Sequence, residues 1–412
     1  MNKRSLFFFE DFTIIFINNI NSGRIMGAEL EFQDLVFEYR NNAIRAYFMK
    51  YFYFDIEASE LLKIADFALN AHKITFNTTQ AKAERQFNRL ISRMIAEKLK
   101  TLKGNSAVYI HNPPIVGSLR FGLVDRDSNV IEVRPITGCN LNCIYCSIDE
   151  GIESSRTDYI VDRDLLVSEF KKLIADKTDV EAHIGPQGEP LMYAHLPGLI
   201  REISSIARVK NISIDTNGVL LTREMVDRLA EAGLTRINLS INAIDADLAR
   251  KIAGCNYNIS KILDMAKYIS AKMQLLIAPV LLPGINEQEM PKIIEFAKSV
   301  NARLGIQNFL EYKGGRNPVK QLSWDEFNKK LEGWEKQFNV KLKLDLNDFG
   351  IKEQKTLKKP FRKGQVIEAD IIYGEYAAAK ERLIKIKPEK QKGKARIKIT
   401  RDKHNVFFGS VL

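Results

Sequence analysis

Three cysteines stand close together in the chain, and their spacing indicates a loop that binds an iron–sulfur cluster. Cys139, Cys143 and Cys146 form the pattern C-x3-C-x2-C directly after an apolar run, and the 412 residues contain one further cysteine, Cys255. Three thiolates on one loop can bind three irons of a [4Fe-4S] cluster, which leaves the fourth iron without a protein ligand. Because an iron with an open position is reactive, the spacing predicts a cluster that takes part in chemistry.

A structural zinc site and a disulfide framework are the simpler interpretations of this cysteine loop. A structural zinc ion normally has four Cys or His ligands, and no second close pair of cysteines or neighbouring histidine completes such a set here. Disulfide frameworks are typical of short secreted chains rather than of a 412-residue chain with four cysteines. The spacing therefore favours the iron–sulfur cluster.

The stretch from Gly138 to Cys146, with Tyr145 directly before the third cysteine, resembles the signature of radical S-adenosylmethionine (radical SAM) enzymes. In that family SAM binds the open iron through its amino and carboxylate groups. One electron from the cluster then cleaves the sulfonium to a 5'-deoxyadenosyl radical, which takes a hydrogen atom from the substrate. The resemblance implies a [4Fe-4S] cluster and SAM as cofactors, and an electron donor such as ferredoxin or flavodoxin as a partner.

Short apolar runs alternate with helix-like segments from Ile131 onward, which is typical of parallel βα units. This number of repeats is two short of an eightfold barrel, and the radical SAM core is known as such a partial (β/α)6 barrel. We therefore expect an α/β fold with a partial (β/α)6 TIM-like barrel in residues 128–320, entered through a hairpin of 119–124 and 130–133. The six expected strands are 131–133, 180–184, 212–215, 236–241, 275–280 and 305–309.

Ligands bind at the carboxyl ends of strands in parallel α/β folds, so the SAM contacts are expected there. The second expected strand leads into Gln187-Gly188-Glu189-Pro190, similar to the family's Gly-Gly-Glu motif with Gln187 in place of the first glycine. The third ends in Thr216-Asn217-Gly218, similar to a Thr-Asn-Gly ending in the family, with a plain Asn-Gly turn as the alternative.

Two later strands complete the expected SAM site. Ser240 and Asn242 are two residues apart and therefore on one face of the fourth strand. Val280 lies in a stretch similar to the one that contacts adenine in relatives. The resemblance thus implies these cofactor-binding residues: Tyr145, Gly188, Glu189, Pro190, Thr216, Asn217, Ser240, Asn242 and Val280.

The positions of the cysteines predict a single cluster. Residues 1–138 contain no cysteine, and none follows Cys255, so no second set of cluster ligands is present. Cys255 itself has two interpretations, a covalent methyl carrier as in some RNA-methylating relatives, or a packed thiol, since a free cysteine behaves as a small hydrophobe.

Residues 1–127 are predicted to form a mostly helical N-terminal region without a catalytic motif. The segments 30–53 and 79–102 carry aromatic and aliphatic residues at helical spacing. Residues 1–25 are expected to be an extension, on the hypothesis that translation starts at Met26.

The C-terminal part begins with a helical linker, residues 321–351, opened by the capping box Ser323 to Glu326. Residues 352–412 contain 17 Lys and Arg against 7 Asp and Glu, which is +10 of the chain's net charge of +11. Their apolar residues alternate between turn residues, which predicts a small antiparallel β-barrel.

This basic barrel resembles a TRAM domain, an OB-like module found on tRNA-modifying enzymes. Phosphate contacts from such a module supply affinity for RNA. The simpler alternative is that the lysines only form a solvated surface. Phe407, Phe408 and Tyr373 either stack on bases or fill the barrel interior. The residues expected to bind nucleic acid are Lys385, Lys387, Lys394, Arg396, Lys398, Arg401 and Lys403.

The composition is that of a multidomain globular protein, with 45% hydrophobic and 27% charged residues. No run of 18 apolar residues is present, and Glu10 and Asp11 interrupt the apolar start, so we expect neither a membrane span nor a secretory signal. An oxygen-sensitive cluster also argues for the cytoplasm. The oligomeric state is left open.

These patterns together predict a radical SAM enzyme that modifies a base in tRNA or another RNA. Two alternatives stay open. One is a radical SAM enzyme that acts on a small molecule or a protein side chain. The other is a non-catalytic RNA-binding protein with a structural or redox-sensing cluster. The RNA target, the product and the fate of SAM are not specified by any motif.

Overall fold

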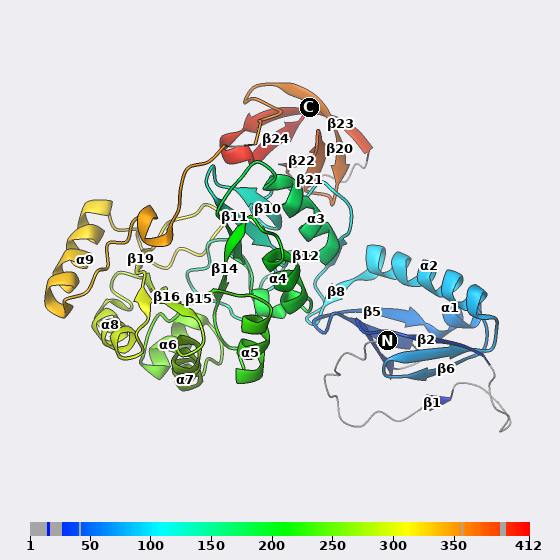
Figure 1. Cartoon of the computed structure of the whole chain (residues 1–412). Helices are drawn as coiled ribbons and strands as arrows, with labels where there is room; N and C mark the ends of the chain where they lie inside the picture. Colours follow the sequence, from blue (N-terminus) through cyan, green and yellow to red (C-terminus); the bar gives the residue numbers. More distant parts are fainter. Residues whose placement is uncertain (1–14, 17–26, 41–42, 356, 388–392) are drawn as a thin grey trace. The chain divides into compact units, whose positions relative to one another are not determined.

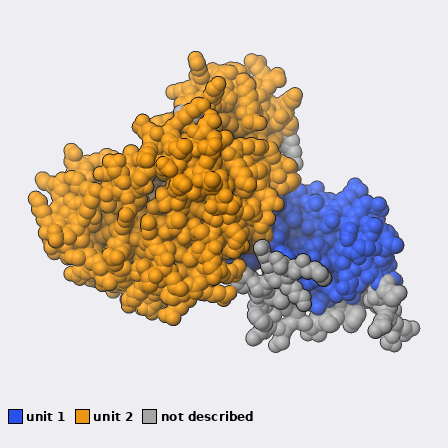
Figure 2. Space-filling model, in the orientation of Figure 1, with its two compact units in different colours: residues 1–109 blue, residues 110–412 orange. Residues whose placement is uncertain are grey.

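The structure is a computed structural model that describes residues 15–16, 27–40, 43–355, 357–387 and 393–412. The chain divides into two compact units, residues 1–109 and residues 110–412 (Figure 2). Met26 and residues 1–25, apart from the short strand at 15–16, lie outside the described residues, so the hypothesis about the start of translation stays a hypothesis.

The first unit is built mainly from strands, which corrects the prediction of a mostly helical region. It contains two antiparallel four-stranded sheets, with strand orders β1-β6-β7-β2 and β3-β4-β5-β8. The strands are β1 (Ile15–Phe16), β2 (Ala28–Glu31), β3 (Leu35–Arg40), β4 (Ala43–Phe48), β5 (Phe52–Glu57), β6 (Phe67–Asn70), β7 (Lys73–Phe76) and β8 (Lys100–Thr101). The helices are α1 (Ala58–Leu62) and α2 (Gln80–Lys98).

The prediction failed because the aromatic residues of this region alternate with a period of two. In β5, Phe52, Phe54 and Ile56 are buried and the residues between them are more exposed. Such alternation is the signature of a strand with one buried face. The second helical segment is confirmed, since α2 buries an apolar stripe that includes Phe87 and Leu90.

The second unit contains the expected TIM-like α/β fold, in which helices alternate with the strands (Figure 1). Its seven-stranded sheet has the order β10-β11-β13-β14-β15-β16-β18, with β10 antiparallel to β11 and all later pairs parallel. The predicted hairpin is therefore confirmed. The strands are β10 (Gly122–Asp125), β11 (Val130–Arg134), β13 (Val180–Ile184), β14 (Val209–Thr216), β15 (Arg236–Leu239), β16 (Gln274–Ile277) and β18 (Arg303–Leu304).

The last two predicted strands differ from the observed ones: the strand predicted at 275–280 is interrupted after Ile277, and the strand predicted at 305–309 contains β19 but not β18, which ends at Leu304. After β16 the chain continues as β17 (Val280–Leu281), and after β18 as β19 (Gln307–Asn308), and these two pieces pair with each other. Pro279 stands at the first break, where its ring nitrogen has no hydrogen to donate to the ladder. β9 (Ala107–Ile110) and β12 (Asp158–Val161) are short strands outside the main sheet.

The helices between the strands begin at capping residues that the sequence supplies. Asp162, Thr222 and Asp245 accept hydrogen bonds from backbone N–H groups of the first turns of α3, α5 and α6. Each of these helices buries one apolar face. The helices are α3 (Arg163–Leu173), α4 (Leu196–Ser204), α5 (Arg223–Glu231), α6 (Ala246–Ala253), α7 (Ile259–Ser270) and α8 (Met290–Ser299).

The C-terminal part of this unit is a helix followed by a closed five-stranded barrel. The predicted capping box is confirmed at the start of α9 (Trp324–Phe338). The barrel has the order β20-β21-β22-β24-β23 and a core that includes Ile371, Ile384, Ile397 and Phe407. Its β22–β24 pair is parallel, so the prediction of a purely antiparallel barrel is wrong at that one pair. The strands are β20 (Val366–Ile372), β21 (Tyr376–Ala379), β22 (Arg382–Lys385), β23 (Gly393–Arg401) and β24 (Phe407–Val411).

Among the described residues, no helix has both the length and the apolar character that crossing a membrane requires.

Candidate functional site

A cavity of about 320 Å³ lies at the carboxyl ends of the parallel strands and contains the cysteine loop. The structure thus brings together predicted cofactor-site residues from five different segments of the sequence. Of the predicted cofactor-site residues, Pro190 alone does not line it. The predicted residues that do are Cys139, Cys143, Tyr145, Cys146, Gly188, Glu189, Thr216, Asn217, Ser240, Asn242 and Val280.

The cysteine loop is fixed by backbone hydrogen bonds to the end of α6. The N–H groups of Asn142 and Ile144 donate to the carbonyl oxygens of Ala253 and Ile252, at 2.9 and 3.0 Å. Gly254 follows with a left-handed backbone, φ +66°, and a Cβ atom there would lie 2.1 Å from the carbonyl oxygen of Asn142. A side chain at this position would therefore push the cysteine loop away from the helix.

Arg316 holds the other side of the cysteine loop. Its Nε atom donates to Asp149 at 2.7 Å, its Nη1 atom donates to the carbonyl of Cys143 at 3.0 Å, and its backbone N–H donates to the carbonyl of Cys146 at 2.9 Å. The sequence analysis missed this residue, because no motif marks it and its partners are more than 160 positions away. The loop that carries the cysteines is thus fixed from both sides.

The three cysteines are half-buried at the cavity, a setting that suits cluster binding. Burial and the nearby carboxylate of Glu189 raise the pKa of Cys139 well above its usual range, and burial and Cys146 raise that of Cys143 to about 12. Iron binding must therefore displace the thiol protons, as is general for metal-binding cysteines. The backbone N–H of Glu150 donates to Sγ of Cys146 at 3.3 Å, a contact typical of cluster surroundings.

The donor set and the cavity fit a [4Fe-4S] cluster with a bound organic molecule. In the described part of the chain, no three Cys, His, Asp or Glu side chains are arranged to hold one metal ion. A cluster does not require such convergence, because each thiolate binds a different iron. In addition, Oε1 of Gln187 and Oδ1 of Asn308, both on residues that line the cavity, are buried without a hydrogen-bond partner in the described structure.

Glu189 joins the ends of β13 and β14 through its buried carboxylate. It accepts hydrogen bonds from the hydroxyl of Thr216 at 2.7 Å, the N–H of Asn217 at 2.9 Å and the N–H of Leu191 at 3.0 Å. Burial raises the pKa of Glu189 to about 7 despite these three donors. Pro190, which is also buried, follows it and begins a short 3-10 helix. The side chain of Glu189 is therefore committed to holding the strand ends in place.

Asn242 connects the cysteine loop to the next two strand ends. Its Nδ2 atom donates to the hydroxyl of Tyr145 at 2.7 Å, and its Oδ1 atom accepts from the N–H of Val280 at 2.8 Å. Tyr257, which the sequence analysis missed, also lines the cavity and donates to the carbonyls of Asn217 and Ser240 at 3.2 and 3.3 Å. The predicted residues thus form one connected network around the cavity.

The structure places most of the predicted nucleic-acid-binding residues on the outside of the C-terminal barrel. Lys394, Arg396 and Lys398 alternate along β23 on its exposed face. Lys387, Arg401 and Lys403 are also exposed.

Two aromatic residues and one lysine of the barrel have other surroundings. Phe407 is fully buried in the barrel core, whereas Phe408 is half-buried and has the guanidinium of Arg401 5.2 Å from its ring centroid. Lys385 lies between the core residues Ile384 and Ile386 and so on the outer side of the barrel, as predicted, but its side chain is not fully exposed. Lys385 is half-buried in an ion pair with Glu375 and lies 4.7 Å from the ring centroid of Tyr376, and burial lowers its pKa.

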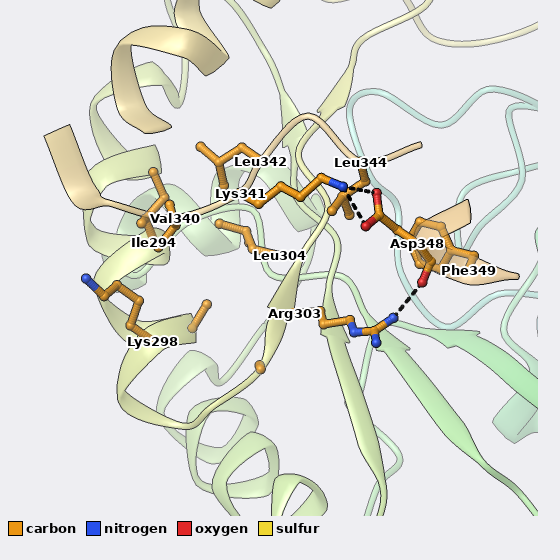
Figure 3. Close-up of a pocket in the computed structure, with 12 residues that line it drawn as sticks. Ile294, Lys298, Arg303, Leu304, Val340, Lys341, Leu342, Leu344, Asp348 and Phe349 are labelled. Atoms are coloured by element: carbon orange, nitrogen blue, oxygen red, sulfur yellow. Dashed lines mark hydrogen bonds and ion pairs between the residues drawn. The ribbon is translucent and has the colours of Figure 1, made fainter. Parts of the chain in front are cut away.

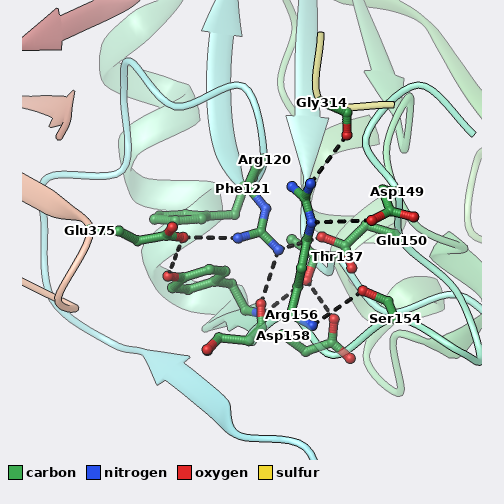
Figure 4. A network of polar contacts seen from close by, with 12 residues as sticks. Arg120, Phe121, Thr137, Asp149, Glu150, Ser154, Arg156, Asp158, Gly314 and Glu375 are labelled. Atoms are coloured by element: carbon green, nitrogen blue, oxygen red, sulfur yellow. Dashed lines mark hydrogen bonds and ion pairs between the residues drawn. The ribbon is translucent and has the colours of Figure 1, made fainter. Parts of the chain in front are cut away.

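A polar network connects the barrel to the cysteine loop (Figure 4). Glu375, in the turn between β20 and β21, accepts hydrogen bonds from Nη1 of Arg120 at 2.8 Å and from the hydroxyl of Tyr159 at 2.7 Å. The other terminal nitrogen of Arg120 pairs with Glu150, whose N–H contacts Cys146. A single guanidinium therefore contacts both the barrel and the loop that carries the cysteines.

A second cavity, of about 330 Å³, lies between α8, β18 and residues 340–349 (Figure 3). Its charged residues are engaged with one another and with the backbone: Lys341 pairs with Asp348 at 2.6 Å, and Arg303 donates to the carbonyl of Asp348 at 2.8 Å. None of the residues predicted to bind a cofactor or nucleic acid lines it.

Comparison with known proteins identifies the segment that contains the cavity. A sequence model of the radical SAM superfamily matches residues 133–297. An uncharacterized protein of Methanocaldococcus jannaschii is 39% identical over 369 residues, which are 78% of this chain and 85% of that protein. GTP 3',8-cyclase of Lactiplantibacillus plantarum is 31% identical over 202 residues, 48% of this chain and 58% of the cyclase, so the similarity spans less than two thirds of the cyclase. Among solved structures, SuiB of Streptococcus suis bound to S-adenosylmethionine has a TM-score of 0.42 and 15% identity, covering 76% of this chain and 71% of SuiB.

Proposed function

We propose that this chain, which belongs to the radical SAM superfamily, is an enzyme that modifies a base in RNA. Proteins of this superfamily bind a [4Fe-4S] cluster and SAM. When bound, these cofactors supply reductive cleavage of SAM and thereby a 5'-deoxyadenosyl radical. Cys139, Cys143 and Cys146 would hold the cluster.

The residues around the cysteines keep the cavity in a fixed shape. Glu189 connects the ends of β13 and β14, and Asn242 connects Val280 to Tyr145. Gly188 lets the end of β13 approach the chain before the cysteines, since a Cβ atom there would lie 2.8 Å from the carbonyl oxygens of Ile136 and Thr137. Such rigidity supports a radical reaction, because the attacking carbon must be held close to one hydrogen of the substrate.

The exposed basic face of the C-terminal barrel is the observation that supports RNA as the substrate. Lys394, Arg396 and Lys398 follow one another on the outer face of β23, and the last 61 residues carry +10 of the chain's net charge of +11. Phosphate contacts of this kind position a nucleic acid without reading its sequence. The resemblance to TRAM domains adds to this proposal. The target base would have to leave its stack to reach the cavity.

A second candidate function is modification of a free nucleotide. It is favoured by the GTP 3',8-cyclases, whose similarity to this chain, at 31% identity over 202 residues, involves about half of it. The basic barrel would then contact another partner. A third possibility, a non-catalytic RNA-binding protein with a redox-sensing cluster, predicts no reductive cleavage of SAM.

The deciding experiment compares the modified nucleosides in RNA from a wild-type strain and a deletion strain by mass spectrometry. We expect one modified nucleoside to be absent from the deletion strain. The wild-type gene should restore it and a Cys143→Ala gene should not. Identical nucleosides in both strains, together with SAM cleavage by the purified protein, would favour the free nucleotide. We also propose that the enzyme works in the cytoplasm with a ferredoxin or flavodoxin as electron donor.

A further inference from the structure

Three neighbouring strands of the TIM-like fold carry a closed ring of polar side chains. The ring takes two residues from each strand, spaced two apart and therefore on one face of the sheet. The strand register places His183 opposite Ser213, and Asp215 opposite Asn238. Its members are Glu181 and His183 on β13, Ser213 and Asp215 on β14, and Arg236 and Asn238 on β15.

Hydrogen bonds connect these six side chains without a gap. Ser213 donates to Glu181 at 2.7 Å, and the two ring nitrogens of His183 lie 2.9 Å from Oγ of Ser213 and 3.1 Å from Oδ2 of Asp215. Asn238 donates from Nδ2 to Oδ1 of Asp215 at 2.8 Å. It accepts from Nε of Arg236 at 3.0 Å, and Arg236 in turn pairs with Glu181.

The surroundings of His183 favour its protonated form. Oδ2 of Asp215 lies at one ring nitrogen, and Glu181 lies behind the hydroxyl of Ser213 at the other. Burial lowers the pKa of His183, but Asp215, Glu181 and Glu132 outweigh burial, and the net shift is upward.

Asp215 and Asn238 are the members of the ring that line the cavity, and Asp215 is the one of the two that carries a carboxylate. Its side chain is 36% exposed and lines the cavity, whereas those of Glu181 and Arg236 are 5% and 8% exposed. Each carboxylate oxygen accepts one hydrogen bond within the ring, and an ionised carboxylate has about four acceptor positions. About one acceptor position therefore remains on each oxygen, on a carboxylate whose orientation is fixed by His183 and Asn238.

The geometry points to Asp215 as the residue that binds a guanine base in this cavity, either as a free nucleotide or within RNA. A carboxylate with two adjacent acceptors complements a planar group with two adjacent N–H donors. Among the four RNA bases, the guanine edge, with N1–H beside the N2 amino group, presents such a pair. The edges of adenine, cytosine and uracil place an acceptor beside each donor. This inference rests on the proposed function only in taking this cavity as the substrate cavity.

The test measures ligand binding to the cluster-containing, SAM-loaded protein without reductant, by equilibrium dialysis. The probes are GMP, IMP, which lacks the amino group, and AMP. We expect GMP to bind at least about tenfold more tightly than AMP, with IMP between them, because each hydrogen bond to a charged group contributes roughly a factor of ten. Asp215→Asn should weaken GMP binding about 10- to 100-fold and leave AMP binding unchanged.

Asp264→Asn is the matched control, because Asp264 is an exposed carboxylate that pairs with Lys267 away from the cavity. It should bind GMP like the wild type. If Asp215→Asn does not fold, the order of affinities of the wild-type protein, GMP above IMP above AMP, decides the assignment alone. Equal binding of GMP and AMP, or a GMP preference that survives in Asp215→Asn, would overturn the assignment. Arginine amide is a further probe, because its guanidinium also has two adjacent N–H donors. If it binds in a way that requires Asp215, and the protein shows no preference for guanine, the assignment is overturned in favour of a protein substrate.

Short oligoribonucleotides with and without guanosine separate the two sources of guanine. Preference for the guanosine oligomer over free GMP supports RNA, and the reverse supports a nucleotide; both outcomes support Asp215 as the guanine contact. Formation of 5'-deoxyadenosine with dithionite is measured on the same wild-type preparation. Cleavage of SAM without guanine binding overturns this inference and leaves the enzyme assignment standing, whereas absence of cleavage counts against the proposed function itself.

Discussion

The carboxylate of Glu375 accepts a 2.8 Å hydrogen bond from Nη1 of Arg120, and this contact joins the C-terminal barrel to the catalytic fold. Arg120 is the shared partner of two carboxylates, because its Nη2 atom pairs with Glu150 near the last cysteine. The side chains of Arg120 and Glu150 are 11% and 2% exposed, so solvent screens this pair little. We therefore expect the stability of the barrel and that of the cysteine loop to be coupled.

Arg120→Met tests this coupling. Removal of the guanidinium leaves the buried Glu150 without its cation, whereas Glu375 keeps Lys385, and loss of one partner of a buried ion pair typically costs about 3–5 kcal/mol. We expect a marked fall in the thermal unfolding temperature and faster loss of the cluster. Both are measurable anaerobically, by circular dichroism and by absorption of the cluster.

The matched control for Arg120→Met is Arg250→Met. Arg250 pairs with Asp247 on an exposed helix face, where the side chains are 48% and 87% exposed, and such pairs contribute little. Equal unfolding temperatures for Arg120→Met and Arg250→Met would show that the barrel and the loop are not coupled through this guanidinium.

The number of irons tests the assignment of the cluster ligands. Anaerobically reconstituted wild-type protein should bind about four irons and four sulfides, since one set of three cysteines is available. Replacement of Cys139, Cys143 and Cys146 by Ala should remove the cluster. Cys255→Ala, the matched control, should retain it. A result near eight irons per chain would contradict a single cluster.

The ring around His183 predicts a pH-dependent contribution to stability. The folded protein raises the pKa of His183 above its usual value near 6.5, through Asp215, Glu181 and Glu132 and against the effect of burial. A raised histidine pKa stabilises the folded state fully below the unfolded pKa, and this contribution is lost as the pH rises through the folded pKa. His183→Gln should therefore destabilise the protein more at about pH 6 than at about pH 9.

Chemical denaturation at both pH values measures this difference. His195→Gln serves as a comparison for a histidine at the start of α4, outside the ring. A His183→Gln penalty that stays constant between the two pH values would mean that the imidazolium does not contribute through its charge.

Local patterns made the catalytic fold predictable from the sequence. The second strand was predicted at the bounds that β13 has, Val180–Ile184, because its apolar residues alternate with Glu181 and His183 between turn residues. The cysteine spacing likewise predicted the loop at the centre of the cavity. Each of these signals lies within a few consecutive residues.

The errors have a different origin. In the first unit, aromatic residues of β3, β4 and β5 were assigned to helices, although their period of two already favoured strands. The ion pair that half-buries Lys385 was not predicted, because the folded barrel alone brings Glu375 to it.

The missed site residues depend on contacts that no local pattern contains. Arg316 reaches Cys143 across 173 positions, and the ring through His183 and Asp215 is built from three strands whose polar residues look like ordinary alternation. These residues become functional candidates because the fold brings them together, and their residue types alone do not mark them.

The basic face of the C-terminal barrel predicts strongly salt-dependent RNA binding. Each phosphate neutralised on single-stranded RNA adds about −0.7 to the slope of log affinity against log salt concentration. The double reversal Arg396→Glu and Lys398→Glu on the exposed face of β23 should weaken tRNA binding and flatten the slope by about 1.4. Lys385 is left intact, because its pair with Glu375 supports the barrel.

The control for this experiment carries the same change in net charge elsewhere. Lys329 and Lys336 are exposed on α9, outside the barrel, and their double reversal to Glu should leave the slope near that of the wild type. Both variants should still form 5'-deoxyadenosine from SAM with dithionite, because neither touches the cavity. If the two double reversals lower tRNA affinity equally, net charge rather than the barrel face is responsible, and if neither lowers it, the free nucleotide becomes the leading substrate.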